Sequence, residues 1–325
     1  MALRASVVVP TFRRPESLSR CLAALCTQAF DPAAYEVIVV DDAASDEARR
    51  VVACWAERAA VRGLALRYVP VTGAHGPAAA RNAGWRAARG PIIAFTDDDC
   101  LPAPDWLAAG VAAFVDGVAG ASGRVIVPLP PRPTDYERNT AAIEHAEFVT
   151  ANCFYRRDVL AAVGGFDERF RAPWREDSDL FFTLLGRNAR LVCVPEAAVV
   201  HAVRPTRWGV SVRQQRKSMF NALLYKKHPV LYRQKIQAAP PWHYYCCLLA
   251  AVAALGGVLG GARRLACSAA SLWMVLTGGF CVQRLRHTSH APAHIAEMIV
   301  TSALIPPLAI LWRLRGALTF RVLFF

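Results

Sequence analysis

The sequence has few acidic side chains and no recognisable cysteine pattern. It contains 25 Asp and Glu against 38 Lys and Arg, giving a net charge of +13, and residues 204–235 carry nine basic side chains with no acid among them. The ten cysteines form no C-x-x-C pair and show no metal-ligand spacing. A disulfide framework is therefore not expected in a chain of this length, and a reducing compartment fits better.

The basic block at residues 204–235 could meet either nucleic acid or an anionic membrane surface. No nucleic-acid motif accompanies it, and long apolar segments follow at once. The mean hydropathy of the chain is +0.25 and 54% of its residues are apolar, which is high for a purely soluble protein. We therefore expect membrane lipids, and not nucleic acid, to be the partner of this block.

Three apolar stretches follow the basic block. Those at about 244–262 and 265–282 carry no charge and are each long enough to span a bilayer, with room for only a tight hairpin between them. A buried helical pair in a soluble protein is the alternative interpretation. The third stretch, about 295–312, is interrupted by Pro306-Pro307, which favours a re-entrant segment or a kinked third span. A basic tail follows it, so we expect a cytoplasmic C-terminus.

The first half of the chain alternates short apolar runs with amphipathic stretches. This alternation predicts an α/β fold with a mostly parallel sheet. The expected strands are Ser6–Val9, Glu36–Val40, Leu64–Val69, Pro91–Phe95, Thr150–Tyr155 and Arg190–Val194, and the expected helices are Glu16–Leu25, Asp46–Ala60, Gly76–Ala88 and Ser178–Leu185.

Polar side chains follow the predicted strands. The most prominent are Asp97, Asp98 and Asp99, directly after the run that ends at Phe95. Acids at the carboxyl end of such a strand lie where open α/β sheets bind ligands. Asp97 and Asp99 alternate to the same side, so both can hold one hard divalent cation.

The order of these motifs resembles the family 2 glycosyltransferases, which use nucleotide sugars and have the GT-A fold. The matching segments are V-V-V-P-T-F at 7–12, V-V-D-D at 39–42, A-A-A-R-N-A-G at 78–84, F-T-D-D-D at 95–99, G-G-F-D-E-R-F at 164–170, E-D at 176–177 and His201. The resemblance implies a Rossmann-like GT-A domain over residues 1–205. A basic juxtamembrane helical segment, 206–242, and a membrane-associated region, 243–325, would follow.

The resemblance also assigns residues to the donor and to a metal. The nucleotide sugar would be held by Pro10, Thr11, Asp41, Asp42, Arg81, Asp97 and Asp98. A forked, permanently charged arginine suits a diphosphate. Asp97, Asp99 and His201 would hold Mn²⁺ or Mg²⁺, which stabilises charge on the leaving nucleotide.

On the acceptor side, the resemblance makes Asp177 the catalytic base, with Glu176 as its substitute. The competing interpretation is that Asp177 caps the helix that follows. Trp174 could stack on an acceptor sugar and Asn152 is assigned to the same side. The sequence Arg213-Gln214-Gln215-Arg216-Lys217 lacks the Q-x-x-R-W signature of processive synthases, which disfavours polymerisation.

The sequence thus predicts a metal-dependent inverting glycosyltransferase at the cytoplasmic face of the cell membrane, with a glycan or lipid-linked acceptor. Two alternatives remain open: a membrane protein that binds sugar nucleotides without transferring the sugar, and a nucleotidyltransferase. The second would need a glycine-rich phosphate loop after the first strand, and residues 10–14 contain no glycine.

Overall fold

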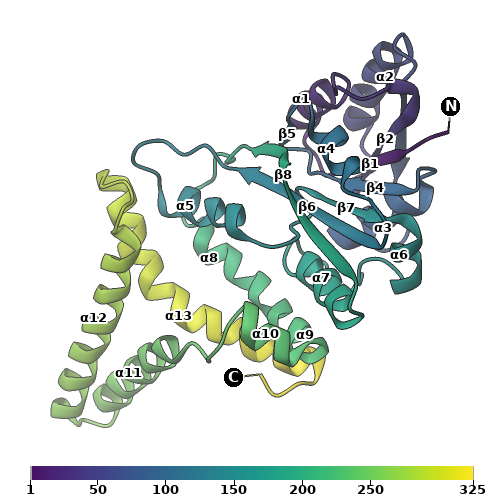
Figure 1. Ribbon diagram of the computed structural model, residues 1–325. Helices are drawn as coiled ribbons and strands as arrows, with labels where there is room; N and C mark the ends of the chain where they lie inside the picture. The colour runs from purple at the N-terminus through teal and green to yellow at the C-terminus, as the bar shows by residue number, and fades with distance from the viewer. Residues whose placement is uncertain (1, 325) are drawn as a thin grey trace. The chain divides into compact units, whose positions relative to one another are not determined.

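The computed structural model describes residues 2–324 of the chain (Figure 1). The chain divides into two compact units. The first comprises residues 1–128 and 141–203, and the second comprises residues 129–140 and 204–325. The short segment 129–140 thus groups with the C-terminal unit, away from its neighbours in the sequence.

An eight-stranded mixed sheet forms the centre of the first unit, with the strand order β3-β2-β1-β4-β7-β6-β8-β5. Strands β3, β2, β1 and β4 run parallel, β6 is parallel to β8, and β7 and β5 are antiparallel to their neighbours. The strands are β1 (Ala5–Thr11), β2 (Tyr35–Asp41), β3 (Ala65–Pro70), β4 (Ile92–Phe95), β5 (Cys100–Pro102), β6 (Val118–Ile126), β7 (Cys153–Arg156) and β8 (Arg190–His201).

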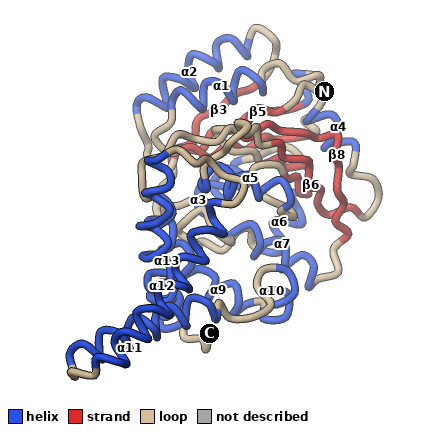
Figure 2. Tube along the Cα trace, turned by 90° about the vertical axis from the view of Figure 1, so that its left-hand side faces the viewer, coloured by secondary structure: helices blue, strands red, loops and turns tan. Residues whose placement is uncertain are grey.

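Helices cover both faces of this sheet, as Figure 2 shows for α1 and α2 on one side and α3, α6 and α7 on the other. The β-branched residues of β1 and β2 are buried on both faces, which is typical of parallel strands covered by helices. The helices of this unit are α1 (Pro15–Leu25), α2 (Asp46–Ala60), α3 (Pro77–Ala87), α4 (Trp106–Ala112), α6 (Arg157–Val163) and α7 (Glu176–Gly186).

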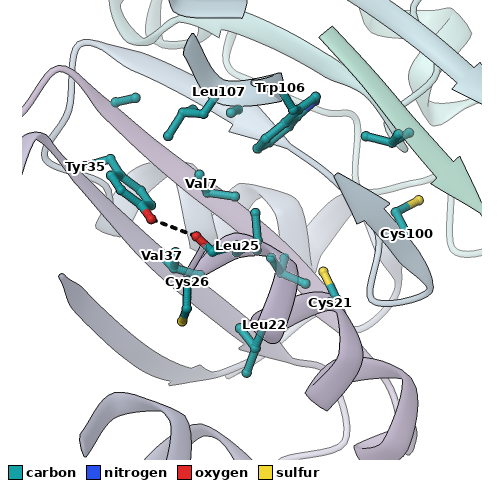
Figure 3. Close-up of a cluster of buried hydrophobic side chains, with 14 of the residues drawn as sticks. Val7, Cys21, Leu22, Leu25, Cys26, Tyr35, Val37, Cys100, Trp106 and Leu107 are labelled. Atoms are coloured by element: carbon teal, nitrogen blue, oxygen red, sulfur yellow. Dashed lines mark hydrogen bonds between the residues drawn. The ribbon is translucent and has the colours of Figure 1, made fainter. Parts of the chain in front are cut away.

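The hydrophobic core on the first face joins β1 and β2 to α1 and α4 (Figure 3). Leu22 and Leu25 of α1 lie on one helical face and are fully buried against this sheet. The hydroxyl of Tyr35 donates a hydrogen bond to the backbone oxygen of Leu25 at 2.7 Å, so the one polar atom of that ring is satisfied. The core therefore fixes α1 beside the ends of β1 and β5.

Helix α3 packs closely on the opposite face. A side chain at Gly84 would collide with Val8 and Val40, so only glycine allows this approach. The small residues of the A-A-A-R-N-A-G segment thus have a packing function. They bring Arg81, on the same helix, beneath the carboxyl ends of the strands.

The second unit is helical. It contains α5 (Asp135–Ala141), α8 (Val210–Gln214), α9 (Met219–Lys227), α10 (Pro229–Lys235), α11 (Trp242–Leu259), α12 (Arg263–Leu285) and α13 (Pro292–Phe320). Helices α11 and α12 pack along each other as a hairpin (Figure 1). A partly buried ion pair between Arg284 and Asp135, 2.7 Å long, ties the segment 129–140 to this unit, and Arg284 also donates to Thr301 and Ser302 of α13.

Three features differ from the expectation. Strands β5 and β6 were not predicted, because three residues are too few to show periodicity and β6 contains two glycines. Helix α7 begins at Glu176, two residues before the predicted start. Helix α13 runs unbroken through Pro306 and Pro307, although proline removes backbone hydrogen bonds. Ile305 and Pro306 are buried, so packing holds the helix at this point.

Candidate active site

Three neighbouring parallel strands end at the same edge of the sheet. They are β2, β1 and β4, and the residues at or just after their ends include Thr11, Asp41, Asp42 and Asp97. Open α/β sheets bind ligands at this edge. The topology therefore brings together the polar clusters that the sequence places after each strand.

Arg81 links the two acidic motifs. Its Nη2 donates to Asp97 Oδ1 at 2.8 Å and its Nη1 donates to Glu176 Oε1 at 3.0 Å. The arginine and Glu176 are both buried, whereas the Asp97 side chain is 25% exposed. The acid triplet after β4 and the E-D pair at the start of α7 therefore belong to a single site.

The surroundings of Glu176 raise the pKa of its carboxyl group. Burial raises the pKa of Glu176 to about 7, with the neighbouring Asp177 carboxylate as a further cause, while Arg81 opposes the shift. A carboxyl group with a pKa near neutrality is often found at functional sites. Here the arginine favours the ionised form of Glu176 and so limits the rise of its pKa.

Asp177 occupies the first turn of α7, next to Glu176 but less buried. Its Oδ1 accepts the backbone N–H of Ser178 at 2.6 Å. Helix α7 itself follows Arg175, whose φ of 78° lies in the left-handed region. The positive end of the helix dipole at this N-terminus favours a carboxylate. Asp177 thus lies inside the helix and not at the capping position that the competing interpretation required.

Asp98 is held by the protein on both of its oxygens. Thr11 Oγ1 donates to Oδ2 at 2.7 Å and Arg14 Nη1 donates to Oδ1 at 3.0 Å. Burial raises the pKa of Asp98, and Arg14 and Thr11 oppose the shift. These bonds fasten the triplet to the end of β1. Asp98 therefore holds the loop in place, and its contact with a nucleotide stays a prediction.

Asp99 and His201 form the part of the site that fits a metal. His201 Nε2 lies 3.6 Å from Asp99 Oδ1, and His201 Nδ1 has no hydrogen-bond partner among the described residues. Two ligands at about 2.1 Å from one ion, at a tetrahedral angle, are roughly 3.4 Å apart. The separation and the donor set suit a divalent cation. Asp97, the third predicted ligand, pairs with Arg81 and is not in the group that Asp99 and His201 form with Cys100.

The two acids after β2 have different surroundings. Asp41 is fully buried and accepts from Ala43, Ser45 and Tyr68, so it stabilises the turn into α2 and is not available to a nucleotide. Asp42 instead faces the loop before α3. Its Oδ1 lies 2.9 Å from His75 Nδ1, and the Gly76 N–H donates to Oδ2 at 3.0 Å.

The two acceptor-side residues differ in the same way. Asn152 is fully buried, accepts from Trp106 Nε1 and donates to the backbone oxygens of Arg124 and Ala197. An acceptor cannot reach it, so Asn152 is a core residue that joins β6, β8 and α4. Trp174 is 37% exposed, with the Arg175 guanidinium 4.5 Å from its ring centre, and its role towards an acceptor stays a prediction.

Sequence reasoning missed Arg14, His75 and Cys100. Arg14 follows Thr11 by three residues, and its charge beside an acid-rich loop was the available signal. Cys100 directly follows the triplet, and its thiol lies with Asp99 and His201 in a group whose ligand atoms are all within 4.8 Å of one another. His75 gave no sequence signal, because its contact with Asp42 is long-range.

The sequence profile of Glycosyl transferase family 2 matches residues 6–164, and that of Glycosyl transferase family group 2 matches residues 92–282. Glycosyltransferase AglE of Haloferax volcanii is 31% identical over 171 residues, which are 50% of this chain and 55% of that protein. Validoxylamine A glucosyltransferase of Streptomyces hygroscopicus subsp. limoneus is 37% identical over 109 residues, 33% of this chain and 23% of the relative. The chain thus spans about half or less of the length of these curated relatives.

Among solved structures, the chain is similar to a mannosyltransferase from Pyrobaculum calidifontis in complex with GDP-Man and Mn²⁺. The TM-score is 0.59 at 22% identity, and the similarity covers 99% of this chain and 88% of the other. This likeness shows the GT-A fold that the sequence predicted. Because the second profile spans more than half of the residues and the acidic motifs occur in the expected order, the chain belongs to the family 2 glycosyltransferases.

Proposed function

We propose that the protein is a metal-dependent, inverting glycosyltransferase that moves a sugar from a nucleotide-sugar donor to a lipid-linked or membrane-proximal glycan acceptor. The observation that carries the proposal is the bridge from Arg81 to Asp97 and Glu176. It joins the acids suited to the donor diphosphate and its cation with those suited to the acceptor, and transfer needs both.

On the donor side, Thr11 and Asp42 lie at the strand ends where the nucleoside would bind, and Arg81 offers a buried cation to the phosphates. Asp97, Asp99 and His201 would hold Mn²⁺ or Mg²⁺. When bound, such an ion stabilises negative charge on the departing nucleoside diphosphate.

On the acceptor side, Asp177 is the proposed base. Its carboxylate takes the proton of the acceptor hydroxyl as that oxygen bonds to the anomeric carbon and the bond from this carbon to the diphosphate oxygen breaks. This single displacement inverts the anomeric configuration. Glu176 is buried and accepts a hydrogen bond from Arg81, so we assign it to positioning the start of α7, where Asp177 lies.

The acceptor class and the location follow from the second unit. Three helices, α11, α12 and α13, are long and apolar enough to cross a membrane. We propose that α11 and α12 cross it and that the catalytic unit faces the cytoplasm, where nucleotide sugars are made. Helix α13 packs along α9 and carries the buried polar residues Thr301, Ser302 and Arg313, which supports a non-crossing position.

The test is a turnover assay on the full chain in detergent, with UDP-, GDP- and dTDP-sugars and Mn²⁺. A transferase releases nucleoside diphosphate, and removal of the metal with a chelator stops the release. Asp177→Asn should lose about 10²–10⁴-fold in rate while it keeps donor affinity. Asp116→Asn, an exposed acid of the same unit, is the matched control.

Each alternative has its own outcome in this assay. Donor binding without turnover for any acceptor would favour the sugar-nucleotide-binding protein. Release of pyrophosphate from a nucleoside triphosphate and a sugar phosphate would favour the nucleotidyltransferase. If Asp177→Asn loses donor affinity and rate by the same factor, Asp177 is a structural residue of α7 and not the catalytic base.

A further inference from the structure

We propose that Cys100 completes, with Asp99 and His201, a site for thiophilic divalent ions such as Zn²⁺, which then compete with Mn²⁺ at the same residues. The inference rests on the divalent-cation site of the proposed function and adds a ligand and a metal class to it. Neither the sequence motifs nor the comparisons assign Cys100 a function.

Strand pairing positions the three residues. Cys100 opens β5 and is the direct cross-strand partner of His201, the last residue of β8. The two side chains of such a pair lie on the same face of the sheet. Asp99 immediately precedes Cys100, and its backbone oxygen accepts the N–H of Ala202. Two antiparallel strands therefore hold three ligands of different chemistry.

The distances suit one ion. The carboxylate oxygen, the thiol sulfur and a ring nitrogen are all within 4.8 Å of one another, and Asp99 Oδ1 is 3.6 Å from His201 Nε2. That separation is too long for a good hydrogen bond. Tetrahedral zinc has bonds of about 2.0–2.3 Å to oxygen, nitrogen and sulfur, so an ion between these atoms needs only small side-chain adjustments.

The donor set decides which metals are favoured. Carboxylate oxygens alone suit Mg²⁺ and Mn²⁺, whereas a thiolate and an imidazole suit Zn²⁺. On coordination the Cys100 thiol loses its proton to solvent and the sulfur bonds to the ion. The Cys100 side chain is fully buried, so the sulfur would bind the ion from the interior of the protein. Three protein ligands leave the fourth zinc position for water or substrate.

Cys21 provides a natural comparison. It is also fully buried and lies beneath the same loop, because its Sγ contacts the backbone oxygen of Asp97 at 3.6 Å. Figure 3 shows it on α1, with the sulfur of Cys100 pointing away from it. Cys21 is not part of the group formed by Asp99, Cys100 and His201. A thiol effect specific to the site should therefore depend on Cys100 and not on Cys21.

The experiment uses the full chain in detergent, with its exposed cysteines replaced by serine so that only buried thiols remain. These exposed residues are Cys54, Cys193, Cys246 and Cys267. Zn²⁺ affinity is measured by competition with a chromophoric chelator. Cd²⁺ serves as a spectroscopic probe, through the ultraviolet absorption of a cadmium–sulfur bond. Bound Mn²⁺ is followed by electron paramagnetic resonance during Zn²⁺ addition.

We expect one Zn²⁺ to displace one Mn²⁺ and one Cd²⁺ to give a thiolate band. Cys100→Ser should lose the band and weaken Zn²⁺ binding by more than the roughly 10–100-fold that loss of a supporting partner costs. Cys21→Ser should keep both. Cys100→Ala is the second variant if the serine hydroxyl disturbs the core, and thermal unfolding checks that each variant is folded.

The proposal is overturned if Cys100→Ser or Cys100→Ala binds Zn²⁺ as tightly as the parent, or if Cys21→Ser loses the band equally. It is also overturned if Zn²⁺ binds without displacing Mn²⁺. Failure of the proposed function is a separate result, because it would appear as absent Mn²⁺-dependent turnover in the unsubstituted protein, whatever its Zn²⁺ affinity.

Discussion

Replacing Arg81 by methionine should destabilise the catalytic unit in a pH-dependent way. The change removes the guanidinium that pairs with Glu176, a carboxylate with a 4% exposed side chain. Breaking a buried ion pair from one side costs about 3–5 kcal/mol when the remaining charge stays buried. The pKa of Glu176 is about 7, so in the variant this carboxylate can take up a proton at pH 8, which limits the cost to about 1–2 kcal/mol, since one pKa unit is about 1.4 kcal/mol. The contact with Asp97 adds at most about 1 kcal/mol, because the Asp97 side chain is a quarter exposed and solvent screens it.

This free energy corresponds to a fall in melting temperature. For a unit of this size, 1 kcal/mol shifts the melting temperature by about 2–4 °C, so a total loss of about 1–3 kcal/mol should lower the melting temperature of Arg81→Met by roughly 2–12 °C at pH 8. A dye that reacts with newly exposed thiols can follow the transition, because Cys21, Cys26, Cys100 and Cys153 are buried in this unit. Arg86→Met, a substitution on the same helix as Arg81, is the control. The ion pair of Arg86 with Glu168 is exposed, so its loss should change the melting temperature little.

The deficit should depend on pH in a defined direction. The pKa of Glu176 is about 7, above the ordinary value of 4.5, so the folded state takes up a proton as the pH falls towards 7. Without Arg81 this pKa rises further. The Arg81→Met deficit should therefore be largest at pH 8 and shrink as the pH falls below 7, where Glu176 is neutral in both proteins.

A second substitution tests the cause. If the loss comes from an uncompensated charge, Arg81→Met combined with Glu176→Gln should recover most of the melting temperature at pH 8, because no buried anion remains. A fall of less than about 2 °C at pH 8 would refute this reasoning. So would a double variant that melts as low as the single one, or a deficit that grows at low pH.

Asp99→Ala should remove Mn²⁺-dependent turnover and leave the melting temperature of the unit nearly unchanged; turnover close to that of the parent at saturating Mn²⁺ would exclude Asp99 as a ligand. Thr11→Val leaves one Asp98 oxygen without its donor and should cost about 1–3 kcal/mol in thermal unfolding; an unchanged melting temperature would contradict the role given to that bond. A reporter fused to the C-terminus should be active on the cytoplasmic side only, whereas periplasmic phosphatase activity would mean that α13 crosses the membrane.

The sequence alone determined the order of elements through β4 and the edge of the sheet that carries the site. Runs such as residues 5–11 and 35–41 are apolar and β-branched, and the segments between them are helical, so a parallel sheet was the consistent solution. Side chains just after the ends of parallel strands then share one edge. Because this reasoning is local, it located Thr11, Asp42 and Asp97 without any knowledge of contacts.

Only the tertiary structure decided what each acid does. Asp41 and Asp42 are adjacent in sequence, yet one is enclosed by a turn and the other faces a distant loop. Asn152 looks polar and accessible in the sequence but fills its hydrogen bonds inside the core.

The same holds for contacts between distant parts of the chain. Arg81 meets Glu176 from 95 positions away, and Cys100 pairs with His201 through a three-residue strand that has no periodic signal. Burial and partner choice depend on which elements pack against each other, and that information lies in the whole fold and not in any local segment.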